Sequence, residues 1–228
     1  MVLAAVFLTM VAGQASAWGN GANGPNRFGG HDWVLRAAVR AVGPAADWVC
    51  IRKALHATDD PDTHDGTDHA SAPWWHVYDV WGADTYGGAP EAVRNWYLRV
   101  KRRLAEHDNC RASKALGIMS HMLADMAQPM HTDGYLAVED NVHAAYEHAV
   151  DVRCTRSHCR YRMRFDGRDR ARPYVRTVEL AHLAHPYYDD LIKAFHRHRY
   201  NAEVDTITRR ELNRAGNALT DLILSLGR

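Results

Sequence analysis

Residues 120–131, which read SHMLADMAQPMH, decide the fold of this chain. His121 and Asp125 lie four residues apart, a spacing that places two side chains on one face of an α-helix. Leu123 and Met126 lie on the opposite face, so the helix is apolar almost all round and should be buried. A buried carboxylate is costly unless it is paired or bound to a metal ion. The stretch therefore predicts a core helix that holds a metal.

A second pair of the same kind follows one short connection later. His143 and Glu147 are also four residues apart on a predicted helix, and His131 lies between the two pairs. A single pair of this kind is often an ordinary contact between neighbouring side chains on a helix. Two pairs on successive helices present imidazole nitrogens and carboxylate oxygens, which are ligands that zinc prefers. The pattern therefore favours a zinc site.

Helical periodicity extends over most of the remaining sequence. The apolar spacing predicts helices over residues 31–42, 47–55, 90–107, 111–128, 139–152, 173–198 and 203–226. Pro129 ends the helix that carries the first pair, because proline biases the residue before it away from helical backbone. A chain of 228 residues suits one sizeable core. We therefore predict an all-α protein with a single multi-helix domain.

One segment breaks this periodicity. Residues 159–165, which read CRYRMRF, alternate between apolar and basic side chains, and the turn-forming pair Asp166-Gly167 follows. We expect a small β-hairpin or an extended arm here, with any regular sheet minor and confined to residues 154–165. The arginines of residues 153–172 are typical of a solvated face. Their functional interpretation is a transient grip on phosphate-bearing surfaces such as a membrane.

Composition argues against one class of function and is compatible with another. The formal net charge of +1 gives no sign of a strongly basic nucleic-acid-binding protein. The chain contains 15 histidines, a residue that serves in metal ligation and in proton transfer. We interpret most of these histidines as surface side chains, so only the few with ligand spacing support a metal site.

The first 17 residues have features of an export signal. Residues 2–11 are apolar and Ala15-Ser16-Ala17 forms an A-x-A cleavage site, although no lysine or arginine precedes the apolar run. The run is too short to cross a bilayer as a stable helix. We predict a secreted protein in which residues 1–17 are removed and residues 18–228 form the mature domain. The alternative is an apolar N-terminal helix that is retained.

Four cysteines are an even number in a chain expected to be exported, so disulfides are plausible. They are Cys50, Cys110, Cys154 and Cys159. Cys154 and Cys159 are close enough in sequence to close a small loop, but four cysteines allow three pairings and the sequence does not choose among them. A zinc site made of cysteines alone is disfavoured, because the chain has no C-x-x-C pair.

Together these features resemble the zinc-dependent phospholipase C family, which shares its fold with the S1/P1-type nucleases. The pieces that carry the resemblance are Trp18, HDWVLR at residues 31–36, WHVYD at residues 75–79, residues 121–131 and VHAAYE at residues 142–147. They occur in the order found in the family, and they extend over nearly the whole mature chain. Each piece alone is weak, but the combination is specific.

The resemblance implies three zinc ions. The first would be bound by His131, His143 and Glu147. The second would be bound by His76, His121, Asp125 and an aspartate of residues 59–62. The third would be bound by His31, Asp125 and the free amino group and carbonyl oxygen of Trp18. An α-amine has a pKa near 8, so a metal displaces its proton at little cost near neutral pH.

The aspartate ligand of residues 59–62 has three candidates, which are Asp59, Asp60 and Asp62. We favour Asp60, followed by Asp59, and we assign to Asp60 a catalytic role in orienting or deprotonating the attacking water. A competing cluster of polar residues, His64, Asp65, Asp68 and His69, is better interpreted as a solvated loop.

The implied chemistry is hydrolysis of a phosphodiester, in which zinc activates water and holds the phosphoryl oxygens. The leading hypothesis is phospholipase C-like cleavage of a phospholipid to diacylglycerol and a phosphorylated head group, because the interval from Trp18 to His31 is closer to the lipases than to the nucleases. The second is an S1/P1-type nuclease that acts on single strands and requires an aromatic slot for a base. The third is a secreted zinc-binding protein without turnover. The sequence indicates no stable protein partner.

Overall fold

The computed structural model describes residues 28–62, 73–81, 86–133, 140–167 and 170–227. Its helices are α1 (Gly30–Val42), α2 (Ile51–Ala57), α3 (Ala89–Ala105), α4 (Asn109–Asp125), α5 (Asp140–Asp151), α6 (Pro173–Ala184), α7 (Tyr188–His198) and α8 (Ala202–Leu226). Short 3-10 turns occur at η1 (Gly43–Ala46), η2 (Pro73–His76), η3 (Pro129–His131) and η5 (His185–Tyr187). The all-α prediction is confirmed.

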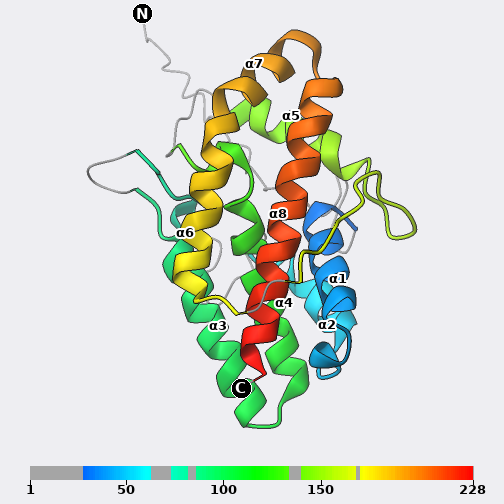
Figure 1. Cartoon of the computed structure of the whole chain (residues 1–228), viewed down its shortest axis with the longest axis vertical. Coiled ribbons are helices and arrows are strands. Elements are labelled where there is room, and N and C mark those ends of the chain that lie inside the picture. The colour runs from blue at the N-terminus through cyan, green and yellow to red at the C-terminus, as the bar shows by residue number, and fades with distance from the viewer. Residues whose placement is uncertain (1–27, 63–72, 82–85, 134–139, 168–169, 228) are drawn as a thin grey trace, which may run out of the picture.

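The α4 helix occupies the centre of the bundle. It packs against α1, α2, α3 and α8, and every residue from Ala115 to Asp125 is buried. Figure 1 shows α3, α4, α6 and α8 running along the long axis, with α1 and α2 on one side and α5 and α7 at one end. Gly117 allows α2 to cross closely, because a Cβ at this position would overlap the carbonyl oxygen of Ala54. The apolar stretch around His121 therefore forms the core, as its pattern predicts.

The C-terminal helices differ from the prediction in one respect. The sequence predicts a continuous helix over residues 173–198, but the structure divides it into α6 and α7, with η5 between them. Pro186 lies in η5, and proline lacks the backbone N–H that a continuous helix requires. The interruption matters for function because His185, at the start of η5, lies beside the segment that follows His131, as its contact with Thr132 shows.

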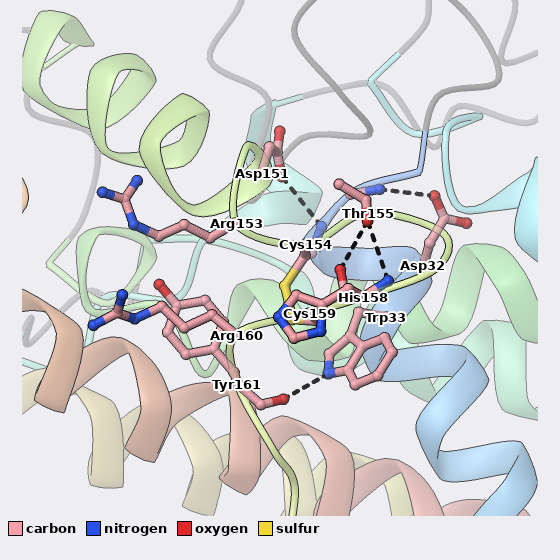
Figure 2. The surroundings of a disulfide bond; sticks show 12 residues. Asp32, Trp33, Asp151, Arg153, Cys154, Thr155, His158, Cys159, Arg160 and Tyr161 are labelled. Atoms are coloured by element: carbon pink, nitrogen blue, oxygen red, sulfur yellow. Dashed lines mark hydrogen bonds between the residues drawn. A yellow bond between two sulfur atoms is a disulfide. The ribbon is translucent and has the colours of Figure 1, made fainter.

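Residues 154–165 form an extended arm and not a regular hairpin. Within the described residues, the arm's β-pairing is limited to one bridge between Cys154 and Cys159, and a disulfide joins the same two residues. Figure 2 shows this disulfide and the Trp33 indole N–H, which donates to the Tyr161 carbonyl oxygen over 3.0 Å. Further along, Asn217 of α8 donates to the Arg164 carbonyl oxygen over 2.9 Å. The arm is thereby tied to α1 and α8.

Among the described residues, no helix is both long and apolar enough to cross a membrane. The predicted export signal at residues 1–17 lies outside the described residues.

Candidate metal centre

Asp125 is the point at which three histidines from different elements converge. Its Oδ2 lies 2.8 Å from Nδ1 of His76 in η2 and 3.5 Å from Nε2 of His121 in α4. Its Oδ1 lies 3.5 Å from Nε2 of His31 in the first turn of α1. The side chains of Asp125, His31 and His121 have no solvent exposure. Three of the predicted ligands therefore surround a fourth, in the core of the bundle.

The first turn of α1 is fixed by two carboxylates, and this sets the position of His31. The Asp32 carboxylate accepts the Gly29 N–H over 3.2 Å, at the start of the helix. The Asp151 carboxylate of α5 accepts the Gly30 N–H over 3.1 Å. As a result, the His31 ring stacks on the His121 ring with 4.0 Å between the ring centroids.

The loop aspartate nearest the histidines is Asp62, and not the favoured Asp60. Asp62 Oδ1 lies 3.3 Å from Nε2 of His121, and Asp62, His76 and His121 form a group able to hold one metal ion. The Asp60 carboxylate instead lies 3.1 Å from Nζ of Lys114, on the outer side of α4. Residues 59–62 form a turn. In this turn the carboxylate of Asp60 reaches Lys114, and the carboxylate of Asp62 reaches His121.

A second group lies next to the first. Glu147 Oε1 is 2.5 Å from Nε2 of His143 and 3.7 Å from Nε2 of His131. The two imidazole nitrogens are 3.0 Å apart. The structure therefore brings together all three of the ligands predicted for the first zinc ion. Glu147 is buried and the His143 side chain is 13% exposed, so this group is at the edge of the core.

Backbone carbonyls orient two of the histidine rings. The Nδ1 of His121 lies 2.7 Å from the Thr58 carbonyl oxygen, and the Nδ1 of His131 lies 2.6 Å from the His76 carbonyl oxygen. A carbonyl only accepts hydrogen bonds, so each Nδ1 must carry a proton, and Nε2 is the ring nitrogen that faces the carboxylates. This is the arrangement that metal-binding histidines commonly show. The contact between His131 and the His76 carbonyl also links the two groups, because the His76 side chain belongs to the first group and its backbone orients His131 of the second.

Gln128 is a site residue that the sequence analysis did not select. It is fully buried between α4 and η3, and its side-chain amide donates to Glu147 Oε1 over 2.8 Å. The same amide nitrogen lies 3.2 Å from Nε2 of His143. A polar residue within an apolar stretch, directly before Pro129, is the signal that indicates such a role. Gln128 fixes the carboxylate of Glu147 in the orientation that faces the histidines.

The electrostatics of the site show how strongly the carboxylates depend on positive charge. Burial by itself raises the pKa of Asp125, but the surrounding histidines, with His121 foremost, outweigh it and hold the pKa well below its usual range. Burial raises the pKa of Glu147 to about 8, against the opposing effect of His131. For His121, burial lowers the pKa, but Asp62 and Asp125 raise it to about 10. The site therefore favours a cation among its carboxylates.

The donor set fits zinc. The oxygens Asp125 Oδ1 and Asp62 Oδ2 are buried and, within the described residues, have no hydrogen-bond partner. In the part of the chain that the structure describes, three candidate groups of histidine and carboxylate have ligand atoms within 4.8 Å of one another. Tetrahedral zinc with bonds of about 2.0–2.1 Å separates its ligand atoms by about 3.3 Å. The separations of 3.0, 3.3, 3.5 and 3.7 Å given above lie around this value. The separations of 2.5 Å between His143 and Glu147 and of 2.8 Å between His76 and Asp125 are shorter and are those of direct hydrogen bonds.

Two features that the sequence analysis names lie outside the described residues. They are Trp18, the predicted N-terminal ligand of the third zinc ion, and the competing cluster at residues 64–69. His31 and Asp125, the other ligands predicted for the third ion, belong with His121 to one of the three candidate groups.

Comparisons with known proteins support the fold. No family model matches the chain, and no curated protein matches it. Among solved structures, the alpha-toxin of an avian strain of Clostridium perfringens superposes with a TM-score of 0.63 and 14% identity, over 90% of this chain. The alpha toxin of Clostridium absonum superposes with a TM-score of 0.66 and 13% identity, also over 90%. The chain spans 64% and 65% of the lengths of these two structures. At this level of identity the likeness establishes a shared all-α fold.

Proposed function

We propose that this chain is a secreted, zinc-dependent phosphodiester hydrolase of the phospholipase C type, which releases diacylglycerol and a phosphorylated head group from phospholipid. The observation that carries the proposal is the convergence of His31, His76 and His121 on the buried carboxylate of Asp125. The second group, formed by His131, His143 and Glu147, adds to it. The fold likeness to the two alpha-toxins is consistent with the proposal.

The ligand set that we propose differs from the sequence-based set at one position. Asp62 replaces Asp60, because Asp62 Oδ1 is 3.3 Å from His121 whereas Asp60 lies against Lys114. The proposal retains three zinc ions, with Trp18 as the N-terminal ligand after removal of residues 1–17. It also retains residues 18–228 as the mature, exported domain.

Zinc bound in this donor set supplies Lewis acidity toward a phosphoryl oxygen and lowers the pKa of water. The residues of the chain contribute positioning and charge. Thr58 and the His76 backbone hold the His121 and His131 rings with Nε2 facing inward. Gln128 holds Glu147 in place. Asp62 has a side chain that is 12% exposed, so it lies where water reaches the site and is placed to accept a proton from the attacking water.

A single-strand nuclease of the S1/P1 type is the second candidate, and one observation favours it. Trp81 is 75% exposed, and its indole contacts the ring of His185. His185 Nδ1 lies 3.0 Å from the carbonyl oxygen of Thr132, the residue after the predicted ligand His131. An exposed indole near a hydrolytic site offers a surface on which a nucleobase stacks. Trp81 therefore supplies the aromatic group that this hypothesis requires.

The decisive experiment compares two substrates with the mature protein that begins at Trp18. We expect zinc-loaded protein to release a phosphorylated head group from phospholipid vesicles faster than it cleaves single-stranded DNA, with each rate compared with its uncatalysed background. A chelator should remove the activity and zinc should restore it. Asp125→Ala should abolish activity and lower zinc content, whereas His182→Ala, at an exposed position, should change neither. Faster cleavage of DNA would favour the nuclease, and no activity in zinc-loaded protein would favour a non-catalytic zinc-binding protein.

A further inference from the structure

A basic pocket lies between the C-terminal half of α3 and the N-terminal half of α4. Its volume is about 370 Å³, within the range of small-molecule sites. The residues that line it are Trp96, Arg99, Arg102, Arg103, Arg111, Lys114 and Ala115. Five of these seven are cationic and none of the described side chains that line it is acidic. The pocket is therefore a local concentration of positive charge in a chain whose formal net charge is only +1.

Helical spacing explains why these side chains converge. Trp96, Arg99 and Arg103 are separated by three and four residues, so they lie on one face of α3. Arg111 and Lys114 share a face of α4 for the same reason. The two helices are joined by only three residues, so they pack side by side and turn these faces toward a common space. The buried Trp96 ring supports Arg99, whose guanidinium carbon is 4.3 Å from the ring centroid.

Glu106, Asp108 and Asp60 pair with cations of the pocket, but none of them is among the side chains that line it. Glu106 lies 2.7 Å from Arg103 and 3.9 Å from Arg102. Arg111 lies 3.4 Å from Asp108, and Lys114 lies 3.1 Å from Asp60. All of these side chains are partly exposed to solvent, where an ion pair contributes at most about 1 kcal/mol. An anion with several oxygens can therefore compete for the same cations.

We propose that this pocket binds a phosphate group, presented either by an anionic lipid head group or as free phosphate. Guanidinium forks match the geometry of phosphate oxygens and form charge-assisted hydrogen bonds with them. The pocket is separate from the metal centre, because Lys114 precedes His121 by seven residues, about 10 Å along α4. Arg162 and Arg164 of the extended arm are exposed and are not among the residues that line this pocket. They therefore serve as a control for basic charge outside the pocket.

The test compares two double variants that remove the same charge. Arg99→Gln with Arg103→Gln alters the pocket, and Arg162→Gln with Arg164→Gln alters the arm. Binding of inorganic phosphate to zinc-loaded protein is measured by titration calorimetry, so that any binding at the metal centre is common to all variants. Loss of one charge-assisted interaction of about 1.5 kcal/mol corresponds to about a tenfold change, so we expect the pocket variant to weaken phosphate binding by about tenfold or more. The arm variant should bind as the wild type does.

A second measurement identifies the source of the phosphate. Co-sedimentation with vesicles of phosphatidylcholine, with and without phosphatidylglycerol, is measured in an Asp62→Asn background, in which we expect turnover to be slow. Loss of phosphatidylglycerol-dependent binding in the pocket variant alone identifies a lipid head group. A phosphate effect without a vesicle effect identifies free phosphate. Equal phosphate binding in the two double variants overturns the proposal.

The variants are chosen so that folding does not confuse the result. Arg99 and Arg103 are only half-buried, and thermal unfolding checks that the double variant folds. If its stability falls, the exposed pair Arg102→Gln with Arg111→Gln provides an independent version of the same test. Because these measurements need no catalysis, the phosphate site can fail while the proposed hydrolase activity stands, and the reverse also holds.

Discussion

At the scale of single residues, helical spacing places the predicted ligand pairs side by side, whereas spacing alone does not determine where a loop aspartate points. His121 with Asp125, and His143 with Glu147, lie on helices, where a spacing of four fixes a shared face. Asp62 lies in a turn, where spacing does not determine direction. Only the three-dimensional contact between Asp62 and His121 distinguishes it from its neighbours. Gln128 was missed for a related reason, because its role depends on a partner on another helix.

Two neighbouring aspartates provide a sharp test of this distinction. We expect Asp62→Asn to lower the phosphodiesterase rate by about 100-fold or more, because it removes a charged ligand and the group placed to accept the proton. Asp60→Asn removes an exposed ion pair with Lys114, which is worth at most about 1 kcal/mol of stability, and should leave the rate near that of the wild type. Steady-state rates and zinc content of both variants decide the matter. A larger loss in Asp60→Asn would restore Asp60 to the ligand set.

A buried carboxylate that belongs to none of the candidate metal groups predicts a pH dependence of stability. Glu211 in α8 is fully buried, with Oε1 2.7 Å from Arg214 and, among the described residues, no hydrogen-bond partner for Oε2. Burial raises its pKa from 4.5 to about 7, against the opposing effects of Arg214 and Arg210. Between these two pKa values the unfolded chain loses the proton and the folded chain keeps it. The contribution of Glu211 to the free energy of unfolding therefore falls as pH rises through this window.

The substitution Glu211→Gln should remove this contribution. We expect the variant to be more stable than the wild type at pH 8, by up to about 3 kcal/mol, and to differ little near pH 4. Urea unfolding at the two pH values measures the difference. Asp221→Asn, which breaks the 2.9 Å ion pair with Arg176, is a useful contrast, because losing one partner of a buried pair should destabilise the protein at pH 8. If the free energy of unfolding changes with pH by the same amount in the wild type and in Glu211→Gln, Glu211 is not the cause of the pH dependence.

At the scale of elements, the helices were predictable because their apolar stripes are long and regular. The exceptions have local causes that the stripes do not reveal. Pro186 divides residues 173–198 into α6 and α7. The arm keeps its alternating pattern, but its partners are the side chains of α8 and the indole of Trp33, so it forms no regular hairpin within the described residues. Alternation predicts extended backbone, and the available partner decides whether a sheet forms.

Two cysteines lie close together at the beginnings of α2 and α4, and we expect them to form a disulfide. The disulfide between Cys154 and Cys159 leaves Cys50 and Cys110, whose sulfur atoms are 2.6 Å apart. Oxidation by a disulfide such as oxidised glutathione would remove two electrons and two protons from this pair and reduce the oxidant to two thiols. The bond would close a loop with a sequence separation of 60 residues, which includes Asp62 and His76. Loop-closure entropy assigns it about 4 kcal/mol of stability.

Peptide mapping without reduction should recover a peptide that joins Cys50 to Cys110 from protein refolded in oxidised glutathione. Cys50→Ser should abolish this peptide and lower the thermal unfolding temperature, relative to oxidised wild type. In reductant, wild type and Cys50→Ser should unfold at similar temperatures, once the bond between Cys154 and Cys159 is reduced in both. Recovery of free thiols at both positions after oxidation would contradict the prediction.

At the scale of the whole molecule, the site depends on segments that are far apart in sequence. His31, His76, Asp125 and Glu147 come from four different elements, and the buried α4 brings them together. No local pattern predicts such a convergence, so in the sequence analysis it rested on resemblance to a family. The likeness to the two alpha-toxin structures covers 90% of this chain but only 64% and 65% of those structures. It therefore concerns the helical bundle of this chain and not the remaining third of each toxin.

The predicted mature N-terminus connects export to the assembly of the site. Trp18 lies outside the described residues, but His31 and Asp125, the other ligands proposed for the third zinc ion, are in place 3.5 Å apart. An uncut chain has an amide nitrogen at Trp18, and that nitrogen has no available lone pair until it loses its proton. A protein with one residue added before Trp18 should therefore fold and keep the two groups formed by His121 and His131 with their partners. It should bind less zinc and lose most of its activity.

Proteolytic exposure of Trp18 should restore both zinc content and rate, which separates a missing ligand from a damaged fold. The matched control is an Asp60→Asn protein that begins at Trp18, because it alters a partly exposed side chain that lies against Lys114 and leaves the N-terminus intact. Metal analysis and initial rates are measured on the extended, trimmed and control proteins after identical zinc loading. The extended protein should be deficient only in the third ion, since the histidines on α4, η2 and α5 do not depend on the N-terminus. Equal zinc content and equal rates in the extended and trimmed proteins would remove Trp18 from the ligand set, and the proposal would then retain two metal ions and no requirement for processing.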